Sequence, residues 1–297
     1  MKKLEKKFSF ILPIHNGETF LEECLNSVLN QNYDNYDVIV IINRCTDNTV
    51  KIIRKFVKKY DRIKVFHSKS SKVGLARNLG IKKSKCDYFI CIDSDDIVSK
   101  DMLKTLNDLV GKNDYDLLRF NASTNHTDKK LFNLEKPSCC YLNMDYLYEV
   151  IDSFIKYGKI NGPMWLYAIN KNYFVNNKFR FVNKLQEDFG IFFYLIYNAK
   201  YIYYVNKELY FYRINNDGIM LNPANQISKL KDTLFFCNLY LKFFKNKICY
   251  EQIKLYLIKL LINKYKKASY ENKKRFIKLI GSSDLYELQS IFNNSII

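Results

Sequence analysis

The chain has 297 residues, of which 48% are hydrophobic and 16% aromatic, so it can bury a large core in one large domain or two smaller ones. Its formal net charge of +18 favours an anionic partner, which is a phosphorylated substrate, an anionic membrane surface or nucleic acid. No stretch reaches the roughly 20 consecutive apolar residues of a membrane-spanning helix, and the apolar run at 8–14 is too short for a signal peptide.

The eight cysteines are spread along the sequence without a C-x-x-C pair or another zinc-ligand spacing. Several of them lie in apolar runs that are typical of a protein core. We therefore expect reduced structural thiols and a cytoplasmic protein.

From residue 8 to about 100, apolar runs alternate with amphipathic segments. Thr19 and Glu22 have the spacing of a capping box at the start of the first helix. Strands separated by helices of this length imply right-handed crossovers and a mainly parallel sheet, in an α/β fold with helices on its faces. The expected strands are 8–14, 36–42, 63–68 and 87–93, and the expected helices are 18–31, about 50–57 and 73–84.

The rest of the chain divides into two parts. Residues 101–222 are less regular and contain Trp165 and an acidic pair, Glu187 and Asp188. Residues 228–281 are helical in pattern and carry 14 Lys and Arg residues against 3 acids. We expect a catalytic domain over 1–222, with halves at 8–100 and 101–222, and a basic helical C-terminal region over 223–297. An apolar helical stripe in that region consists of Ile253, Tyr256, Leu257, Leu260 and Leu261.

Three carboxylates, Asp93, Asp95 and Asp96, lie at the end of the strand expected at 87–93. Like charges this close need a compensating cation or full solvation. Divalent Mg²⁺ or Mn²⁺ commonly uses one or two carboxylates and completes its shell with water and substrate phosphates. The alternative is that these acids only cap the next helix, since Ser and Asp favour helix starts.

Three further positions are candidates for chemistry. Arg77, followed by Asn78, can reach a phosphate with two N–H donors; a solvated surface arginine would be the preferred explanation if it stood alone, but its position just ahead of the acidic strand end changes that. Glu187 and Asp188 border an apolar aromatic segment, where burial can raise the pKa of a carboxylate into the range of a general base; complementing the helix dipole is the alternative. His15 follows the first strand and can contact a nucleobase or have no such role.

These pieces resemble the family 2 glycosyltransferases with the GT-A fold. The turn at Pro13, Ile14, His15 and Asn16 is similar to a P-x-Y-N turn, and "IINRCTDNT" resembles the family's V-D-D-G-S-T-D-N-T. "GLARNLGIKKSKCDYFICIDSDD" looks like the A-R-N-x-G and D-x-D-D block, "MWLYAINKNYF" and "QEDFG" resemble the later W and E-D stretches, and "LYFYR" is similar to a Y-Y-Y-R segment. The resemblance covers residues 8 to about 220.

The resemblance implies a role for each matched residue. Asp188 of the catalytic Glu187–Asp188 pair takes the proton from an acceptor hydroxyl, the anomeric configuration inverts, and Trp165 lies near the acceptor sugar. Asp95, assisted by Asp93, binds the Mn²⁺ or Mg²⁺ that bridges the donor diphosphate. The donor is a nucleotide-sugar, with a UDP-sugar favoured. The donor-binding residues implied in this way are Pro13, His15, Asn16, Asn43, Arg77, Asp93 and Arg213.

The sequence departs from the family pattern at two positions. Ile42 and Asn43 stand where the family has consecutive aspartates, so an amide replaces a carboxylate beside the base, and His15 replaces the usual tyrosine. The Q-x-x-R-W motif of processive members is absent from the sequence, which indicates the transfer of one sugar per encounter.

The basic C-terminal region has two interpretations. It can lie on the inner face of an anionic cytoplasmic membrane and bring the enzyme to a glycan or lipid-linked glycan acceptor, as in surface polysaccharide or lipooligosaccharide synthesis, or it can form a helical cap on the catalytic domain. Two other functions stay open: a sugar nucleotidylyltransferase, and a non-catalytic protein that binds anionic membrane or nucleic acid. With the transferase interpretation no nucleic-acid partner is expected.

Overall fold

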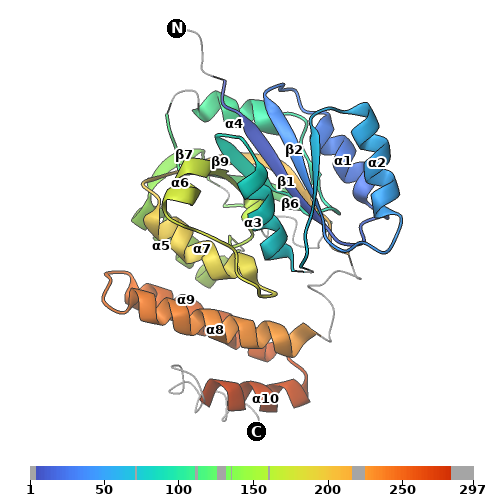
Figure 1. Cartoon of the computed structure of the whole chain (residues 1–297). Coiled ribbons are helices and arrows are strands. Elements are labelled where there is room, and N and C mark those ends of the chain that lie inside the picture. Colours follow the sequence, from blue (N-terminus) through green and yellow to red (C-terminus); the bar gives the residue numbers. More distant parts are fainter. Residues whose placement is uncertain are drawn as a thin grey trace.

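The structure is a computed structural model, and it describes residues 5–70, 72–110, 113–125, 132–134, 136–159, 161–215 and 225–281. Figure 1 shows a central sheet with helices on both faces and a separate layer of helices formed by the C-terminal part of the chain. The strands are β1 (Phe8–Ile14), β2 (Tyr36–Ile42), β3 (Ile63–His67), β4 (Tyr88–Cys91), β5 (Ile97–Val98), β6 (Leu117–Thr124), β7 (Cys139–Leu142), β8 (Tyr167–Asn170) and β9 (Tyr201–Tyr212). The helices are α1 (Leu21–Leu29), α2 (Thr49–Lys59), α3 (Val73–Lys83), α4 (Met102–Val110), α5 (Asn143–Tyr157), α6 (Lys171–Asn176), α7 (Glu187–Asn198), α8 (Gln226–Phe244), α9 (Tyr250–Lys266) and α10 (Tyr270–Gly281), with a 3₁₀ turn, η1, at Met164–Leu166.

The sheet has nine strands in the order β3-β2-β1-β4-β8-β6-β9-β5, and β7 pairs with β9. Strands β1 to β4 pair only in parallel with one another, which confirms the parallel arrangement expected for residues 8 to about 100. From β4 onwards the sheet is mixed, since β8 is antiparallel to both β4 and β6. Strands from both expected halves of the catalytic domain therefore belong to one continuous sheet.

Burial explains why β1 and β2 lie inside the parallel part of the sheet, between β3 and β4. Every residue of these two strands is buried, as expected for parallel strands covered by helices on both faces. The expected capping box is wrong, because α1 starts after Phe20 without a side-chain cap. Instead, Glu18 accepts a hydrogen bond from the backbone N–H of Asn48 at 2.9 Å, and so the carboxylate stabilises the start of α2.

The C-terminal helices pack against the sheet domain through α8 on α7 and α9 on α5. The apolar stripe on α9 faces this contact: Ile253, Leu257 and Leu261 are fully buried, and the ring of Tyr256 lies 4.4 Å from that of Phe154. The stripe is therefore part of a helical cap and is not a membrane-facing surface. The expected boundary at 222/223 and residues 282–297 lie outside the described residues. Among the described helices, none combines the length and the apolar composition needed to cross a lipid bilayer.

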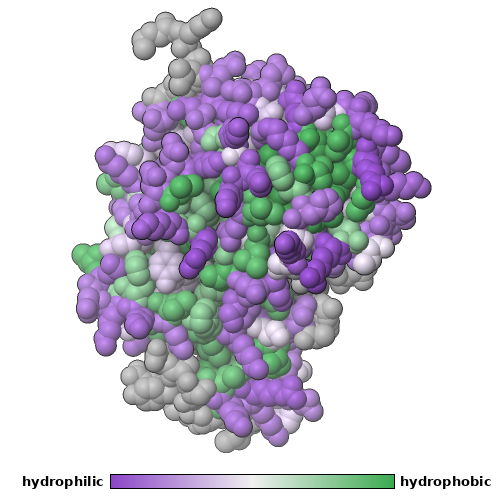
Figure 2. All heavy atoms as spheres, in the orientation of Figure 1, coloured by the Kyte–Doolittle hydropathy of each residue, from purple (hydrophilic) through white to green (hydrophobic). Residues whose placement is uncertain are grey.

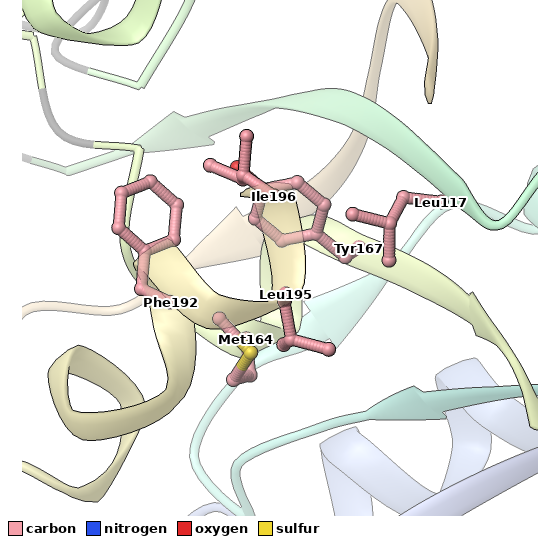
Figure 3. A pocket seen from close by; sticks show the side chains of 6 residues that line it. All are labelled: Leu117, Met164, Tyr167, Phe192, Leu195 and Ile196. Atoms are coloured by element: carbon pink, nitrogen blue, oxygen red, sulfur yellow. The ribbon is translucent and has the colours of Figure 1, made fainter. Parts of the chain in front are cut away.

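Hydrophilic side chains cover most of the face drawn in Figure 2, and apolar side chains show through in patches over the sheet domain and over the C-terminal helices. Inside the molecule, a small apolar space lies between α7 and the sheet and leaves no room for a water-sized molecule (Figure 3). It is a packing gap in the core and has no polar group that could bind a substrate. Its lining consists of Leu117, Met164, Tyr167, Phe192, Leu195 and Ile196.

Candidate functional site

The candidate site lies at the carboxyl ends of β1, β2 and β4, where the loops that follow these parallel strands meet at one edge of the sheet. Hydrogen bonds link these loops: the ring Nδ1 of His15 lies 2.7 Å from the carbonyl oxygen of Asn43, and Asn16 Oδ1 accepts the backbone N–H of Thr46 at 2.8 Å. Asn16 has a φ of 50°, which Asn tolerates better than most residues. Ligands of doubly wound sheets bind at this edge.

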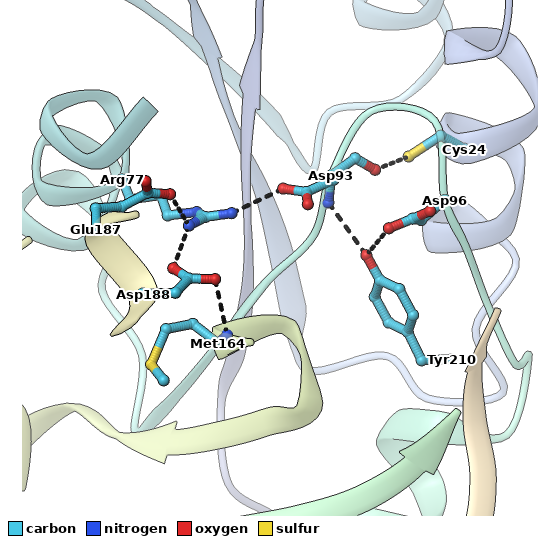
Figure 4. A network of polar contacts seen from close by, with 8 residues as sticks. All are labelled: Cys24, Arg77, Asp93, Asp96, Met164, Glu187, Asp188 and Tyr210. Carbon is cyan, nitrogen blue, oxygen red and sulfur yellow. Dashed lines mark hydrogen bonds and ion pairs between the residues drawn. The ribbon is translucent and has the colours of Figure 1, made fainter. Parts of the chain in front are cut away.

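Arg77 of α3 is the centre of the site (Figure 4). Its Nη2 donates to Asp93 Oδ1 at 2.8 Å, and its Nη1 donates to Glu187 Oε1 at 2.7 Å and to Asp188 Oδ1 at 2.5 Å. The guanidinium thus joins the end of β4 to the start of α7, 110 residues away from it in the sequence. Arg77 was expected to hold the nucleotide or diphosphate directly. Its side chain is only 3% exposed and its terminal nitrogens bind carboxylates, so the structure gives it a different function, which is to position these acids.

One guanidinium charge faces three carboxylates, so the cluster favours retention of a proton. Burial and the negative charge of Asp188 raise the pKa of Glu187 and Arg77 lowers it, and together these effects place it at about 8. Burial also raises the pKa of Asp188, while Arg77 and the backbone N–H of Met164, which lies 3.0 Å from Asp188 Oδ2, lower it. At neutral pH we therefore assign the proton to Glu187 and the negative charge to Asp188.

The second half of the site contains Asp95, Asp96 and Arg213. Asp96 is buried; it accepts hydrogen bonds from the hydroxyl of Tyr210 at 2.6 Å and from the backbone N–H of Arg213 at 2.8 Å. The side-chain Nε of Arg213 donates to the carbonyl oxygen of Asp95 at 2.9 Å, and its Nη2 pairs with Glu23. Asp96 therefore ties β9 to the acidic turn and fulfils a structural function, although these contacts are with β9 and Arg213 and not with the start of a helix.

Asp93 and Asp95 fit a hard divalent cation. Both are only partly buried, and burial together with the charge of Asp93 raises the pKa of Asp95 to about 6. A nearby cation would favour the ionised form of Asp95 and relieve the repulsion between the two carboxylates. Within the described residues, no three His, Cys, Asp or Glu side chains are grouped to hold a metal by themselves. Such a cation would therefore need further oxygen ligands from a substrate diphosphate or water.

The loop after β2 contains an unusual buried amide. Asn43 is 2% exposed, and its side-chain Oδ1 has no hydrogen-bond partner in the described part of the chain. A buried acceptor without a donor is costly, so it is expected to meet a donor from a ligand or a water molecule. Pro13 is buried in β1 opposite Ile41 of β2, and His15 is exposed at the end of β1.

Trp165, which was expected near the acceptor sugar, is enclosed by other aromatic rings. Its indole is 4% exposed and stacks on the ring of Tyr210 at 4.6 Å and on that of Tyr212 at 5.1 Å. The edge of Phe132 covers it further at 5.0 Å. Trp165 therefore presents no open face to a sugar and instead supports Tyr210, the partner of Asp96.

Helix α8 supports the segment that carries Glu187 and Asp188, which the sequence analysis did not foresee. Asp232 accepts the backbone N–H of Leu185 at 2.7 Å and pairs with Lys184 at 3.0 Å. A Cβ on Gly190 would lie 2.4 Å from the ring of Phe236, so α7 and α8 approach closely because this residue is glycine. The sequence signal that could have revealed this contact is Asp232, because it is the one acidic residue of the basic helix α8. In the structure it is buried. Thr233 with Gln186 and Tyr240 with the carbonyl of Phe189 complete these contacts.

The fold and this acidic site define an α/β protein with a ligand site at the carboxyl edge of its parallel strands. The model of the family described as "Glycosyl transferase family 2" matches residues 9–210. The chain belongs to this family. A curated relative, the glycosyltransferase GlyG of Streptococcus pneumoniae serotype 4, is 33% identical over 116 residues, which cover 39% of this chain and 38% of the relative. The alignment thus spans about two fifths of that relative's length.

Two solved structures share the fold. TarS of S. aureus, crystallised as residues 1–349 with UDP-GlcNAc, superposes with a TM-score of 0.72 at 18% identity, over 93% of this chain and 80% of that one. The mannosyltransferase PcManGT of Pyrobaculum calidifontis, in complex with GDP-Man and Mn²⁺, superposes with a TM-score of 0.55 at 11% identity, over 97% and 85%. The expected GT-A fold is confirmed by this similarity.

Proposed function

We propose that the chain is an inverting glycosyltransferase that moves a single sugar from a UDP-sugar to a hydroxyl group of a glycan or lipid-linked glycan. The observation that carries the proposal is the Arg77 cluster, which holds Asp188 and Asp93 on one guanidinium at the edge of the sheet. Asp188 and Asp93 remain 21% and 33% exposed, so both can reach a ligand that lies on this edge. Membership of family 2 supports the same chemistry.

Asp188 is the proposed general base. It takes the proton of the acceptor hydroxyl, whose oxygen forms a bond to the anomeric carbon while the bond from that carbon to the diphosphate oxygen breaks. The bonding electrons leave with the diphosphate. Attack from the face opposite the diphosphate inverts the anomeric configuration. Arg77 and Met164 N–H hold the two Asp188 oxygens in place, which leaves a lone pair on each for the hydroxyl proton.

The donor is proposed to be a UDP-sugar that binds over the loops after β1 and β2. Asn43 Oδ1 needs a donor, and the N3–H of a uracil is one. His15 is exposed beside it and can stack on the base. Asn16 holds the loop that carries these groups through its bond to Thr46. The UDP-GlcNAc of TarS is a donor of the same class in a protein of the same fold.

Asp95 and Asp93 would hold a divalent Mn²⁺ or Mg²⁺ together with the donor diphosphate. Bound there, the cation would supply charge neutralisation of the leaving diphosphate. Arg213, whose side chain is 20% exposed and adjoins Asp95, provides a positive charge on the same side. The Mn²⁺ in the PcManGT complex is consistent with this use of a metal.

The acceptor side is proposed to be a membrane-linked glycan reached from the cytoplasm. The basic residues of the C-terminal helices favour an anionic surface, and no nucleic-acid partner is proposed. The catalytic domain is proposed to extend over 1–222 and the basic helical region over 223–297.

The test is a panel of UDP-, GDP-, CMP- and dTDP-sugars with Mn²⁺, scored for release of free nucleotide by the purified protein. We expect release from one UDP-sugar, dependent on metal, that is lost in Asp95→Ala and in Asp188→Ala. Asp61→Ala removes an exposed carboxylate outside the cluster and should leave the rate unchanged. Pyrophosphate in place of nucleoside diphosphate would identify a nucleotidylyltransferase, and failure to bind or turn over any nucleotide-sugar would favour a non-catalytic binder.

A further inference from the structure

The outer face of α8 carries apolar side chains that stay partly exposed, although the ring of Phe243 also contacts Tyr194 and Tyr197 of α7. Phe235, Leu239 and Phe243 follow one another at intervals of four residues and are 44%, 39% and 37% exposed. Exposed Lys231 and Lys242 lie on the same face. We call these five residues the α8 ridge. Because a helix turns once in 3.6 residues, they form one stripe along its length.

The inner face of the same helix explains why the ridge is not needed for folding. Leu234, Cys237 and Tyr240 are buried against the protein, so α8 already has an apolar face that attaches it. A helix on the surface of a globular protein normally presents polar residues on its other face. On α8, that second face is half apolar.

The ridge is also strongly basic. Lys184 Nζ lies 4.7 Å from the ring centre of Phe235, and Lys247 Nζ lies 4.7 Å from that of Phe243. Exposed Lys245 follows the helix directly. Asp232 is the one carboxylate of α8 and it is buried, so the outer face of the helix has no negative side chain.

We propose that the α8 ridge docks the enzyme onto the surface of an anionic lipid bilayer. Helices that lie on a membrane surface combine lysine with aromatic or leucine side chains. The apolar groups enter the boundary between headgroups and acyl chains, and each lysine near an anionic surface contributes about 1 kcal/mol to the binding free energy. Protein–protein interfaces, by contrast, are depleted in lysine at their centre. The ridge is separate from the α9 stripe, which is buried.

The position of the ridge agrees with the glycosyltransferase function proposed above. The role of membrane docking in catalysis rests on that proposed function. Lys184 contacts Phe235 of the ridge and pairs with Asp232, and it precedes Asp188 by four residues in the sequence. A bilayer against the ridge would therefore lie beside the segment that leads into the catalytic pair. The hydroxyl of a lipid-linked acceptor would then be delivered close to Asp188.

The test is co-sedimentation of the full chain with vesicles of phosphatidylcholine alone and of an equal mixture of phosphatidylcholine and phosphatidylglycerol. We expect binding to the anionic vesicles only, weakened by salt, and reduced about tenfold or more in Leu239→Ser/Phe243→Ser. The matched control is Leu142→Ser/Val175→Ser, which removes two apolar side chains that are each 54% exposed elsewhere and should bind as the wild type does. Lys242→Glu/Lys245→Glu should also weaken binding.

Thermal unfolding shows whether each variant is folded, and donor hydrolysis without vesicles is measured in parallel. We expect the ridge variants to keep that hydrolysis, so loss of membrane binding and failure of the proposed transferase activity are distinguishable. Absence of wild-type binding, or equal loss in the ridge and control variants, would overturn the proposal. A dimer in sedimentation velocity that dissociates in Leu239→Ser/Phe243→Ser would instead make the ridge an interface between copies of the chain.

Discussion

Arg77 and Asp93 form an ion pair of 2.8 Å in which the arginine side chain is almost fully buried. Because the same guanidinium also holds Glu187 and Asp188, the end of β4 and the start of α7 cannot move independently. The proposed metal-binding and base-supplying halves of the site are thus joined through a single side chain. A charge at this depth contributes to function as much through geometry as through attraction.

Replacing Arg77 should damage both stability and activity. Arg77→Met leaves three carboxylates without their cation, and we expect the free energy of unfolding to fall by about 3–5 kcal/mol in urea titrations. Arg77→Lys keeps the charge but not the planar fork, so it should fold better than Arg77→Met and still lose donor turnover. Arg54→Met, which removes an exposed arginine from α2, is the control and should match the wild type.

The two acids of the pair should respond differently to amide substitution. Asp188→Asn removes the proposed base and should lower kcat by about 10²- to 10⁴-fold while the KM for the donor stays near its original value. Glu187→Gln imitates the protonated acid and keeps an acceptor for Arg77, so most of the activity should remain. Steady-state kinetics decide between them, and equal losses in both variants would contradict this division of functions.

The dependence of activity on pH should reflect the burial of Asp188. A base is active only when ionised, and burial raises the pKa of Asp188 above the ordinary 3.8. The rate should therefore fall as the pH is lowered, and should do so above the range of an exposed aspartate. A profile of kcat/KM against pH is the measurement. An acid limb at or below 3.8 would contradict the buried base.

Stability should also vary with pH because of Glu187. Its pKa rises from 4.5 in the unfolded chain to about 8 in the folded one, so the folded state binds the proton more tightly. The stabilisation from this proton is complete below pH 4.5 and is lost as the pH rises through about 8. Glu187→Gln has no such titrating proton. As the pH rises from 4.5 to about 8, the wild type should therefore lose unfolding free energy relative to this variant. Urea unfolding at several pH values measures the difference.

Asp232 should affect the rate although it touches no substrate in the proposed reaction. Asp232→Ala leaves the Leu185 N–H without its acceptor, which costs about 1–3 kcal/mol, and loosens the segment before Asp188. Since a shift of about 1 Å in a catalytic group can cost about 10²-fold, kcat should fall while the KM for the donor changes little. Asp232→Asn, which keeps an acceptor, should restore most of the rate. A variant that changes only the melting temperature would show a purely structural role.

Much of the first half of the fold could be predicted from the local pattern of apolar and polar residues in the sequence. The apolar runs that became β1, β2 and β4 are buried on both faces, β3 at the edge is only partly buried, and the helices between the four strands leave only a parallel arrangement. The acids at 93, 95 and 96 follow β4 and reach the carboxyl edge as expected. Those features depend on neighbours in the sequence, which is why periodicity and spacing were enough to predict them.

The partners of Arg77, Trp165 and Asp232 were decided by tertiary structure alone. Arg77 meets Glu187 across 110 positions of the chain, Trp165 is enclosed by strand β9, and Asp232 reaches back to Leu185 from a helix beyond the family match. Burial of a charged or aromatic side chain depends on which distant segment covers it, and no local pattern records that choice. Composition and spacing were therefore enough to predict the strands and the acidic edge of the sheet. Long-range packing decided which polar side chains bind one another and which can meet a substrate.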